Sequence, residues 1–107
     1  MKRSQFLGGV TMAYVYILRC GDRSLYTGAT LDVMRRLGQH QSGRGAKYTR
    51  SRLPVELVFA ELCGDWAAAL RREREIKRLE RRQKLALIQG DWETVLRAAE
   101  GQNKPQT

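Results

Sequence analysis

A β-hairpin near the N-terminus constrains the fold of this chain more than any other feature. Residues 13–20 are rich in β-branched and aromatic side chains, which is typical of a buried strand. A Gly-Asp-Arg turn follows, and residues 24–28 predict a second, shorter strand. With an odd number of turn residues, Leu18 faces Tyr26, and Tyr16 is the diagonal neighbour of Tyr26 on the same face. The hairpin therefore predicts an antiparallel sheet.

Tyrosines recur on one face of this hairpin. Tyr14, Tyr16 and Tyr26 would present their phenols together. Two interpretations stay open: the rings form part of the core with hydroxyls at its wet edge, or the phenols belong to a reactive site. The residue types alone favour the first interpretation.

The rest of the pattern predicts helices packed on this sheet. The expected order is β-β-α-β-α-α, an α+β fold with a small three-stranded, mostly antiparallel sheet flanked by helices. Residues 1–12 predict a flexible leader, residues 13–90 one domain, and residues 91–107 a short C-terminal helix and a polar tail. After the hairpin, the expected elements are a helix over 31–41 capped by Thr30, a loop over 43–54, a strand over 55–62, a helix over 66–84 that continues or restarts before Gly90, and a helix over 91–100.

Charge and cysteine content narrow the class of function. A chain of 107 residues with 20 basic and 11 acidic side chains carries a net charge of +9, which favours nucleic acid as a partner and an anionic membrane second. No apolar run approaches the ~20 residues that span a bilayer, so no spanning segment is expected, and nucleic acid, not a membrane, is the expected partner. The chain has two cysteines and one histidine, which disfavours a zinc site or a disulfide framework and indicates a reduced, cytoplasmic protein.

A run of basic residues without any acid lies between Val33 and Val55. Glycines in this run leave main-chain N–H groups free to add to the cations, as in a site that contacts phosphates. The alternative is a solvated surface loop. The run contains Arg35, Arg36, Arg44, Lys47, Arg50 and Arg52, with Tyr48 interleaved.

Two glutamates on the predicted helix over 66–84 differ in position. Glu73 falls on the apolar stripe with Leu70 and Ile76, whereas Glu75 falls among arginines on the solvated side. A carboxylate on the inward face is costly unless it is paired or binds a cation. Glu73 is therefore either the partner of an arginine from the hairpin or first helix, or a metal ligand.

The first predicted helix carries a matching stripe. Asp32, Arg36 and His40 are spaced by four residues and lie along one line of the helix. An arginine and the only histidine on one face could bind a phosphate and assist proton transfer. A histidine beside an arginine can also be incidental.

Together these segments resemble the GIY-YIG nuclease family, most closely its small stand-alone bacterial members of the YhbQ type. The resemblance covers about residues 13–89, and this chain departs from it in two ways. Tyr14 replaces the first glycine. Many family nucleases also have an asparagine after the glutamate helix, whereas the only asparagine here is Asn103, in the tail. The matching segments are Tyr14-Val15-Tyr16, Tyr26-Thr27-Gly28, the helix with Arg36-Leu37 and His40, Gly43-Arg44-Gly45-Ala46-Lys47-Tyr48-Thr49-Arg50, and Arg72-Glu73-Arg74-Glu75-Ile76-Lys77.

The resemblance implies a divalent-metal-dependent endonuclease, using Mg²⁺ or Mn²⁺, that hydrolyses DNA phosphodiester bonds. Tyr16 would be the general base or relay and Tyr26 would support it; Arg36 would stabilise phosphate charge, His40 would assist, and Glu73 would hold the metal. A phenol with a pKa near ~10 needs a cation such as Arg36 to favour its phenolate. The expected DNA-binding residues are Arg35, Arg44, Lys47, Tyr48, Arg50, Arg52 and Lys77.

The expected substrate is branched or flapped DNA, cleaved with structural or weak selectivity in repair or recombination, and RNA is the less expected substrate. Two alternatives stay open. One is a catalytically weak or inactive nucleic-acid-binding module with the same fold, and the other is an RNA- or ribosome-associated protein. All three predict salt-sensitive binding, so only metal-dependent cleavage separates the enzyme from the binding modules.

Overall fold

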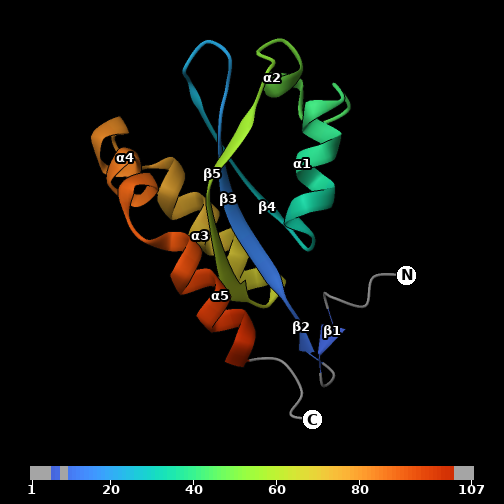
Figure 1. Cartoon of the computed structure of the whole chain (residues 1–107), viewed down its shortest axis with the longest axis vertical. Helices are drawn as coiled ribbons and strands as arrows, with labels where there is room; N and C mark the ends of the chain where they lie inside the picture. The colour runs from blue at the N-terminus through green and yellow to red at the C-terminus, as the bar shows by residue number, and fades with distance from the viewer. Residues whose placement is uncertain (1–5, 8–9, 103–107) are drawn as a thin grey trace.

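The computed structural model describes residues 6–7 and 10–102 and contains a three-stranded antiparallel sheet (Figure 1). The strand order is β4-β3-β5, with β3 (Ala13–Arg19) between β4 (Leu25–Thr30) and β5 (Glu56–Gly64). Leu18 faces Tyr26 across the hairpin, as the turn length predicted. The predicted α+β fold is confirmed.

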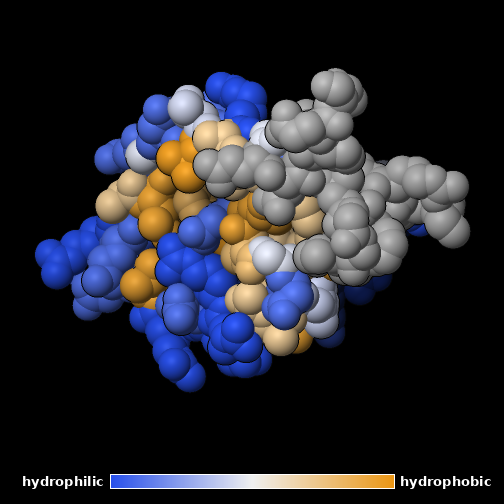
Figure 2. Space-filling model, turned by 90° about the horizontal axis from the view of Figure 1, so that it is seen from below, coloured by the Kyte–Doolittle hydropathy of each residue, from blue (hydrophilic) through white to orange (hydrophobic). Residues whose placement is uncertain are grey.

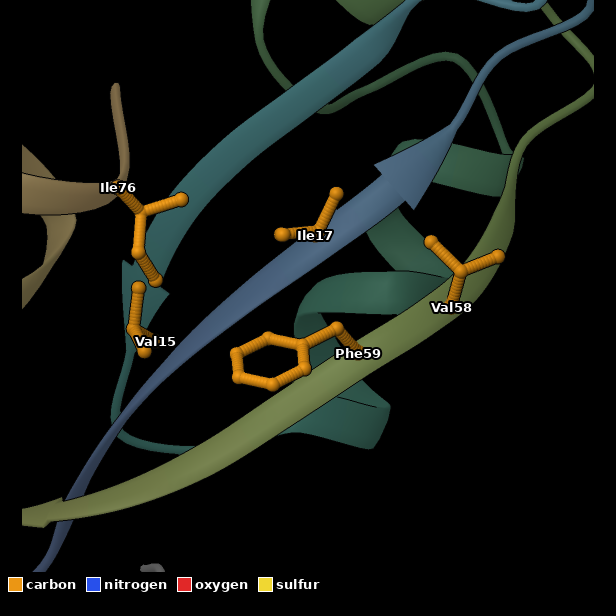
Figure 3. Packing of buried hydrophobic residues seen from close by; sticks show 5 residues of the cluster. All are labelled: Val15, Ile17, Val58, Phe59 and Ile76. Atoms are coloured by element: carbon orange, nitrogen blue, oxygen red, sulfur yellow. The ribbon is translucent and has the colours of Figure 1, made fainter. Parts of the chain in front are cut away.

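The central strand β3 is buried on both faces, and its side chains alternate between two clusters. Val15 and Ile17 pack with Val58, Phe59 and Ile76 on one side (Figure 3). On the other side, the buried cluster consists of Tyr16, Leu18, Cys20, Val55 and Ala60. Because the period of a strand is two, the apolar run of β3 supplies both halves of the core.

Helices cover both faces of the sheet (Figure 1). The face that carries Tyr16 is covered by α1 (Val33–Gln41), next to the short α2 (Lys47–Arg50). The opposite face is covered by α3 (Trp66–Lys77) and α4 (Arg81–Gln89). The last helix, α5 (Trp92–Gln102), packs along β5, and its Trp92 touches both clusters.

The expected cap of the first helix was wrong. The Asp32 side chain caps α1 by accepting a hydrogen bond from the Arg35 amide at 3.1 Å. The Thr30 hydroxyl instead accepts from the Asp32 amide at 3.1 Å. Thr30 still belongs to β4, so the helix begins two residues later than the sequence indicated.

The predicted loop and the long helix also differ from the structure. A helical turn, α2, forms within the expected loop over 43–54. The chain leaves the helix after Lys77 and restarts at Arg81, where Glu80 and Gln83 form a capping box. The Glu80 amide donates to the Gln83 side chain at 2.8 Å, which satisfies a group that a continuous helix would use internally.

Part of the predicted leader pairs with itself. Within residues 1–12, β1 (Phe6–Leu7) and β2 (Val10–Thr11) form a short antiparallel pair, and Met12 is buried. Residues 1–5 and 8–9, like the predicted tail over 103–107 with Asn103, lie outside the described residues. Within the described part of the chain, no helix is both long and apolar enough to span a bilayer.

Hydrophilic side chains do not cover the surface evenly. Seen from below, apolar side chains reach the surface directly beside strongly hydrophilic ones (Figure 2). The exposed apolar side chains include Met34 and Val95, each more than half exposed.

Tyr14, which stands where the family has glycine, connects the sheet to α5. Its hydroxyl donates to the Glu100 carboxylate at 2.7 Å, and the side chain is 7% exposed. Burial and the neighbouring carboxylate raise the pKa of Tyr14, so this phenol stays protonated as the donor. Its hydroxyl is therefore engaged with α5 instead of joining the other phenols.

Replacing Tyr14 with Phe should lower the free energy of unfolding by about 1 to 2 kcal/mol, because a hydrogen bond to a charged group is lost. Urea unfolding followed by circular dichroism measures this. Tyr48→Phe is the matched control, since Tyr48 is 38% exposed and its side-chain contacts with Tyr26 and Arg52 use the ring, which Phe keeps, so it should change stability little. Equal stability of Tyr14→Phe and wild type would show that this bond does not hold α5.

Candidate active site

Three rings from three elements meet on the α1 side of the sheet. The ring centroids of Tyr16 and Tyr26 are 6.4 Å apart, and the His40 ring lies 5.8 Å from the first and 5.3 Å from the second. Tyr48 from α2 stacks on Tyr26 at 5.9 Å. The hairpin phenols and the only histidine are thus brought together, as expected for one site.

A chain of hydrogen bonds runs through His40. The Tyr16 Oη and His40 Nε2 atoms are 2.8 Å apart, and His40 Nδ1 is 2.8 Å from Thr49 Oγ1. Thr49 Oγ1 donates its single proton to the Ala46 carbonyl at 2.9 Å. It must therefore accept from His40 Nδ1, which leaves Nε2 as an acceptor. Tyr16 accordingly donates its hydroxyl proton to His40 Nε2.

This chain is buried and closely packed. His40 and Thr49 are fully buried, and Tyr16 is 2% exposed. A Cβ atom at Gly28 would lie 2.7 Å from Tyr16 Cζ, and one at Gly45 would overlap the His40 ring. Neither position has room for a side chain, so both glycines are needed for the rings to meet.

Burial raises the pKa of Tyr16 and lowers the pKa of His40. The pKa of Tyr16 is raised to about 12, chiefly by burial; the nearby Arg36 guanidinium lowers it only in part. Arg36 therefore favours the phenolate, as expected, but desolvation outweighs the cation and the phenol stays protonated. Burial and then Arg36 lower the pKa of His40 to about 4. At neutral pH the phenol keeps its proton and the imidazole is uncharged.

Arg36 is positioned beside both groups. Its Nη1 donates to Gln39 Oε1 at 2.9 Å, and the side chain is half-buried. Together with Arg35 and Trp66, these two residues line a groove of about 580 Å³ between α1 and the start of α3. The groove brings two arginines to the edge of the ring cluster.

Glu73 and Glu75 of α3 differ in solvent exposure, as their helical positions predicted. The Glu73 side chain is 17% exposed and Glu75 is 62% exposed. Glu73 pairs with Lys77 at 3.1 Å, not with an arginine of the hairpin or of α1. The charge of Glu73 also raises the pKa of Tyr16, by less than burial and Tyr26 do.

Glu73 allows a metal site with a single protein carboxylate. Among the described residues, no three His, Cys, Asp or Glu side chains come together as a ligand set. Glu73 Oε2 meets Lys77, and Oε1 has no hydrogen-bond or ion-pair partner in the described part of the chain. Mg²⁺ commonly takes one or two carboxylates and completes its shell with water and phosphate oxygens. Glu73 fits such a loosely held cation and does not fit a closed structural site.

The basic residues of the 43–52 segment divide into two groups. Arg44, Lys47 and Arg50 are exposed. Arg52 lies with its guanidinium carbon 3.8 Å above the Tyr48 ring and its Nε 3.1 Å from Asp22. Arg52 therefore braces Tyr48 against the hairpin turn, although the sequence placed it with the DNA-binding residues.

Several residues of the site were not singled out from the sequence. Thr49 binds His40, and Gly45 leaves room for the His40 ring. Gln39 binds Arg36 and is the only one of these three residues that lines the groove. The available signal was the single histidine, because a buried imidazole needs a partner on each nitrogen.

Comparison with known proteins identifies the family of this chain. Residues 12–86 match the model of the GIY-YIG catalytic domain. The chain therefore belongs to the GIY-YIG nuclease family.

Within this family, the chain is similar to UPF0213 proteins. It is 51% identical over 76 residues to one from Staphylococcus haemolyticus, covering 71% of this chain and 93% of that protein. It is 54% identical over 76 residues to one from Streptococcus sanguinis, covering 71% and 87%. The solution NMR structure of a Bacillus halodurans UPF0213 protein, 43% identical, matches with a TM-score of 0.50 over 84% of this chain and 96% of that one.

The buried His40 predicts a pH dependence of stability. Its pKa is about 4 in the folded protein and 6.5 for an ordinary histidine, so between these values only the unfolded chain binds the proton. Stability should therefore rise with pH from about 4 to about 6.5, by up to ~1.4 kcal/mol per pH unit from this group.

Urea unfolding at several pH values measures this dependence for wild type and His40→Gln. The variant should be less stable, but its stability should fall less steeply on acidification. Parallel pH dependences of the two proteins would refute the assignment of an uncharged, buried His40.

Proposed function

We propose that this protein is an endonuclease that hydrolyses DNA phosphodiester bonds with the help of Mg²⁺ or Mn²⁺. The observation that carries the proposal is the buried hydrogen bond from Tyr16 to an uncharged His40 beside Arg36. The proposed substrate is branched or flapped DNA, cleaved with structural or weak selectivity in repair or recombination. The free thiols of Cys20 and Cys63 support a reduced, cytoplasmic setting.

Tyr16 acts in this proposal as a proton relay. A phenol with a pKa of about 12 is a weak donor of its proton and cannot begin as a base at neutral pH. As the attacking water loses a proton to Tyr16 Oη, the phenol proton passes to His40 Nε2, which is free to accept it. The oxygen of the water bonds to phosphorus, and the leaving oxygen departs on the opposite side.

Neighbouring groups support this transfer. Arg36 stabilises negative charge on the phosphate, and its bond to Gln39 holds the guanidinium in place. Thr49 keeps the His40 ring in the tautomer that accepts at Nε2. Tyr26 supports the rings by packing between His40 and Tyr48.

Glu73 is the residue proposed to hold the divalent cation, through the carboxylate oxygen that Lys77 does not use. A bound cation would polarise the phosphoryl oxygens and stabilise the leaving oxygen. The effect of the Glu73 charge on the pKa of Tyr16 supports this placement.

The DNA backbone is proposed to follow the exposed basic residues near the rings. Arg44, Lys47 and Arg50 lie on the segment that covers His40, and Arg35 lies in the groove beside Arg36. Lys77 neutralises Glu73, Tyr48 presents its exposed ring, and Arg52 positions that ring.

The ion pair between Lys77 and Glu73 favours a second candidate function. An ammonium group already compensates the carboxylate, so the fold could bind nucleic acid without cutting it. A gel assay for nicking with and without Mg²⁺ or Mn²⁺, on branched, flapped and linear DNA, decides between the enzyme and the binding module. No nicking on any of these substrates would overturn the proposed function.

Replacing Glu73 with Gln should reduce nicking by orders of magnitude, because the amide keeps the shape and loses the charge that binds the cation. DNA binding should persist through the basic surface. Glu75→Gln is the matched control, since an exposed helix ion pair contributes only about 0.3–0.5 kcal/mol, and it should nick nearly as wild type.

Nicking rate and melting temperature are measured for both variants. A lower melting temperature of Glu73→Gln with wild-type nicking would assign Glu73 a structural role and refute the proposed metal ligand.

Replacing Arg44, Lys47 and Arg50 together with Ala should weaken binding similarly for all linear DNA sequences. The slope of log Kd against log salt concentration should fall by about 2 to 3, because three phosphate contacts are lost. Fluorescence anisotropy measures both quantities. The control removes three exposed arginines elsewhere, with Arg74, Arg82 and Arg97 each replaced by Ala. If both triple variants lower the slope equally, the 43–50 segment is not the specific DNA contact.

A further inference from the structure

A second group of arginines lies at the hairpin turn, on the side away from the phenols. Arg19 at the end of β3, Arg23 in the turn and Arg81 at the start of α4 line a hollow of about 490 Å³, together with Leu85. We name it the three-arginine hollow. Arg81 Nη2 donates to the Arg23 carbonyl at 2.9 Å, so α4 and the turn are connected across it.

The charges of this hollow are not compensated by any carboxylate in the described part of the chain. Among the described residues, none of the three guanidinium groups has a carboxylate within ion-pair distance. Glu56 stands opposite Arg19 in the sheet register but does not form an ion pair with it. The acids nearest in sequence are engaged elsewhere, Asp22 with Arg52 and Glu80 with Arg82. Three cations around one hollow repel each other unless an anion joins them.

The turn itself is unfavourable for an arginine. Arg23 has a φ of 72°, in the left-handed region that glycine or asparagine adopts more easily. Arg23 thus has a strained backbone conformation and lies beside two further arginines, Arg19 and Arg81. The geometry suits a ligand with several anionic oxygens, which guanidinium groups bind in pairs.

The hollow and the candidate active site lie on opposite sides of the same turn. Arg19 follows Val15 and Ile17 on the face covered by α3 and α4, whereas Tyr16 and Leu18 point to α1. Of two adjacent turn residues, Asp22 is bound by Arg52 beyond α2, and Arg23 is bound by Arg81 of α4. Figure 1 shows the hairpin turn rising between α2 and α4.

We propose that the three-arginine hollow is a second phosphate-binding site, which engages the backbone of a second segment of the DNA molecule whose first segment lies at Tyr16. Phosphate binding by the hollow is inferred from its arginines alone, whereas the engagement of a second DNA segment rests on the proposed function. A DNA that presents two segments at an angle reaches both sides of the turn, whereas one straight duplex reaches only one.

Binding without divalent metal tests this proposal, because affinity is then read without cleavage. Fluorescence anisotropy compares a linear duplex with a forked DNA of equal length and charge, at several salt concentrations. The test variant is Arg19→Gln with Arg81→Gln. The control is Arg82→Gln with Arg97→Gln, which removes two exposed arginines outside the hollow.

Wild type should bind the fork about tenfold or more tightly than the duplex, and the test variant should lose this preference while its affinity for the duplex changes less than about twofold. The salt slope for the fork should fall by about 2, since two phosphate contacts disappear. The control should keep the preference. No preference in wild type, or an equal loss on both DNAs in the test variant, overturns the proposal.

Inorganic phosphate distinguishes the two sources of the anion. Calorimetry should show phosphate binding to wild type and not to the test variant. If a saturating phosphate concentration also abolishes the preference for the fork over the duplex, phosphate and the DNA segment bind at the same site. Phosphate binding without any fork preference assigns the hollow to a small free anion and overturns the DNA segment. A protein that prefers the fork but never nicks DNA refutes the proposed nuclease and leaves this site standing.

Discussion

The buried hydrogen bond between Tyr16 and His40 is the interaction on which the rest of the site depends. Removing an imidazole and a phenol from water is costly unless their polar atoms find partners. Here Thr49 and the Ala46 carbonyl complete the chain, which requires α1, α2 and β3 to meet at one place. The rings fit only because Gly28 and Gly45 have no side chain. The polar chain thereby sets how the helices approach the sheet.

Burial also decides the direction of proton transfer. It raises the pKa of Tyr16 and lowers the pKa of His40, so donor and acceptor are already distinct before any substrate arrives. Groups with pKa values moved apart in this way are suited to opposite roles in acid-base chemistry. Arg36 adds a positive charge that favours phosphate and disfavours a protonated His40. The bound phosphate would offset this second effect during the transfer.

The hairpin turn divides the cationic surface. On one side, Arg52 is compensated by Asp22 and covers the Tyr48 ring, so the turn stabilises the wall of the ring cluster. On the other side, Arg81 donates a hydrogen bond to the Arg23 carbonyl. The charge of the Arg81 guanidinium has no counter-ion among the described residues. A high net charge alone favours nucleic acid, and the fold determines where that charge is neutralised and where it remains available.

The sequence by itself determined the hairpin, its register and the contrast between Glu73 and Glu75, because turn length and helical or strand periodicity are local properties. It also carried the motifs of the family. Only the tertiary structure decided that Thr49 holds His40, that Tyr16 is harder to ionise instead of easier, and that Arg52 braces a ring. The physical reason is that desolvation and hydrogen-bond partners depend on segments that are distant in sequence and meet only in the folded chain.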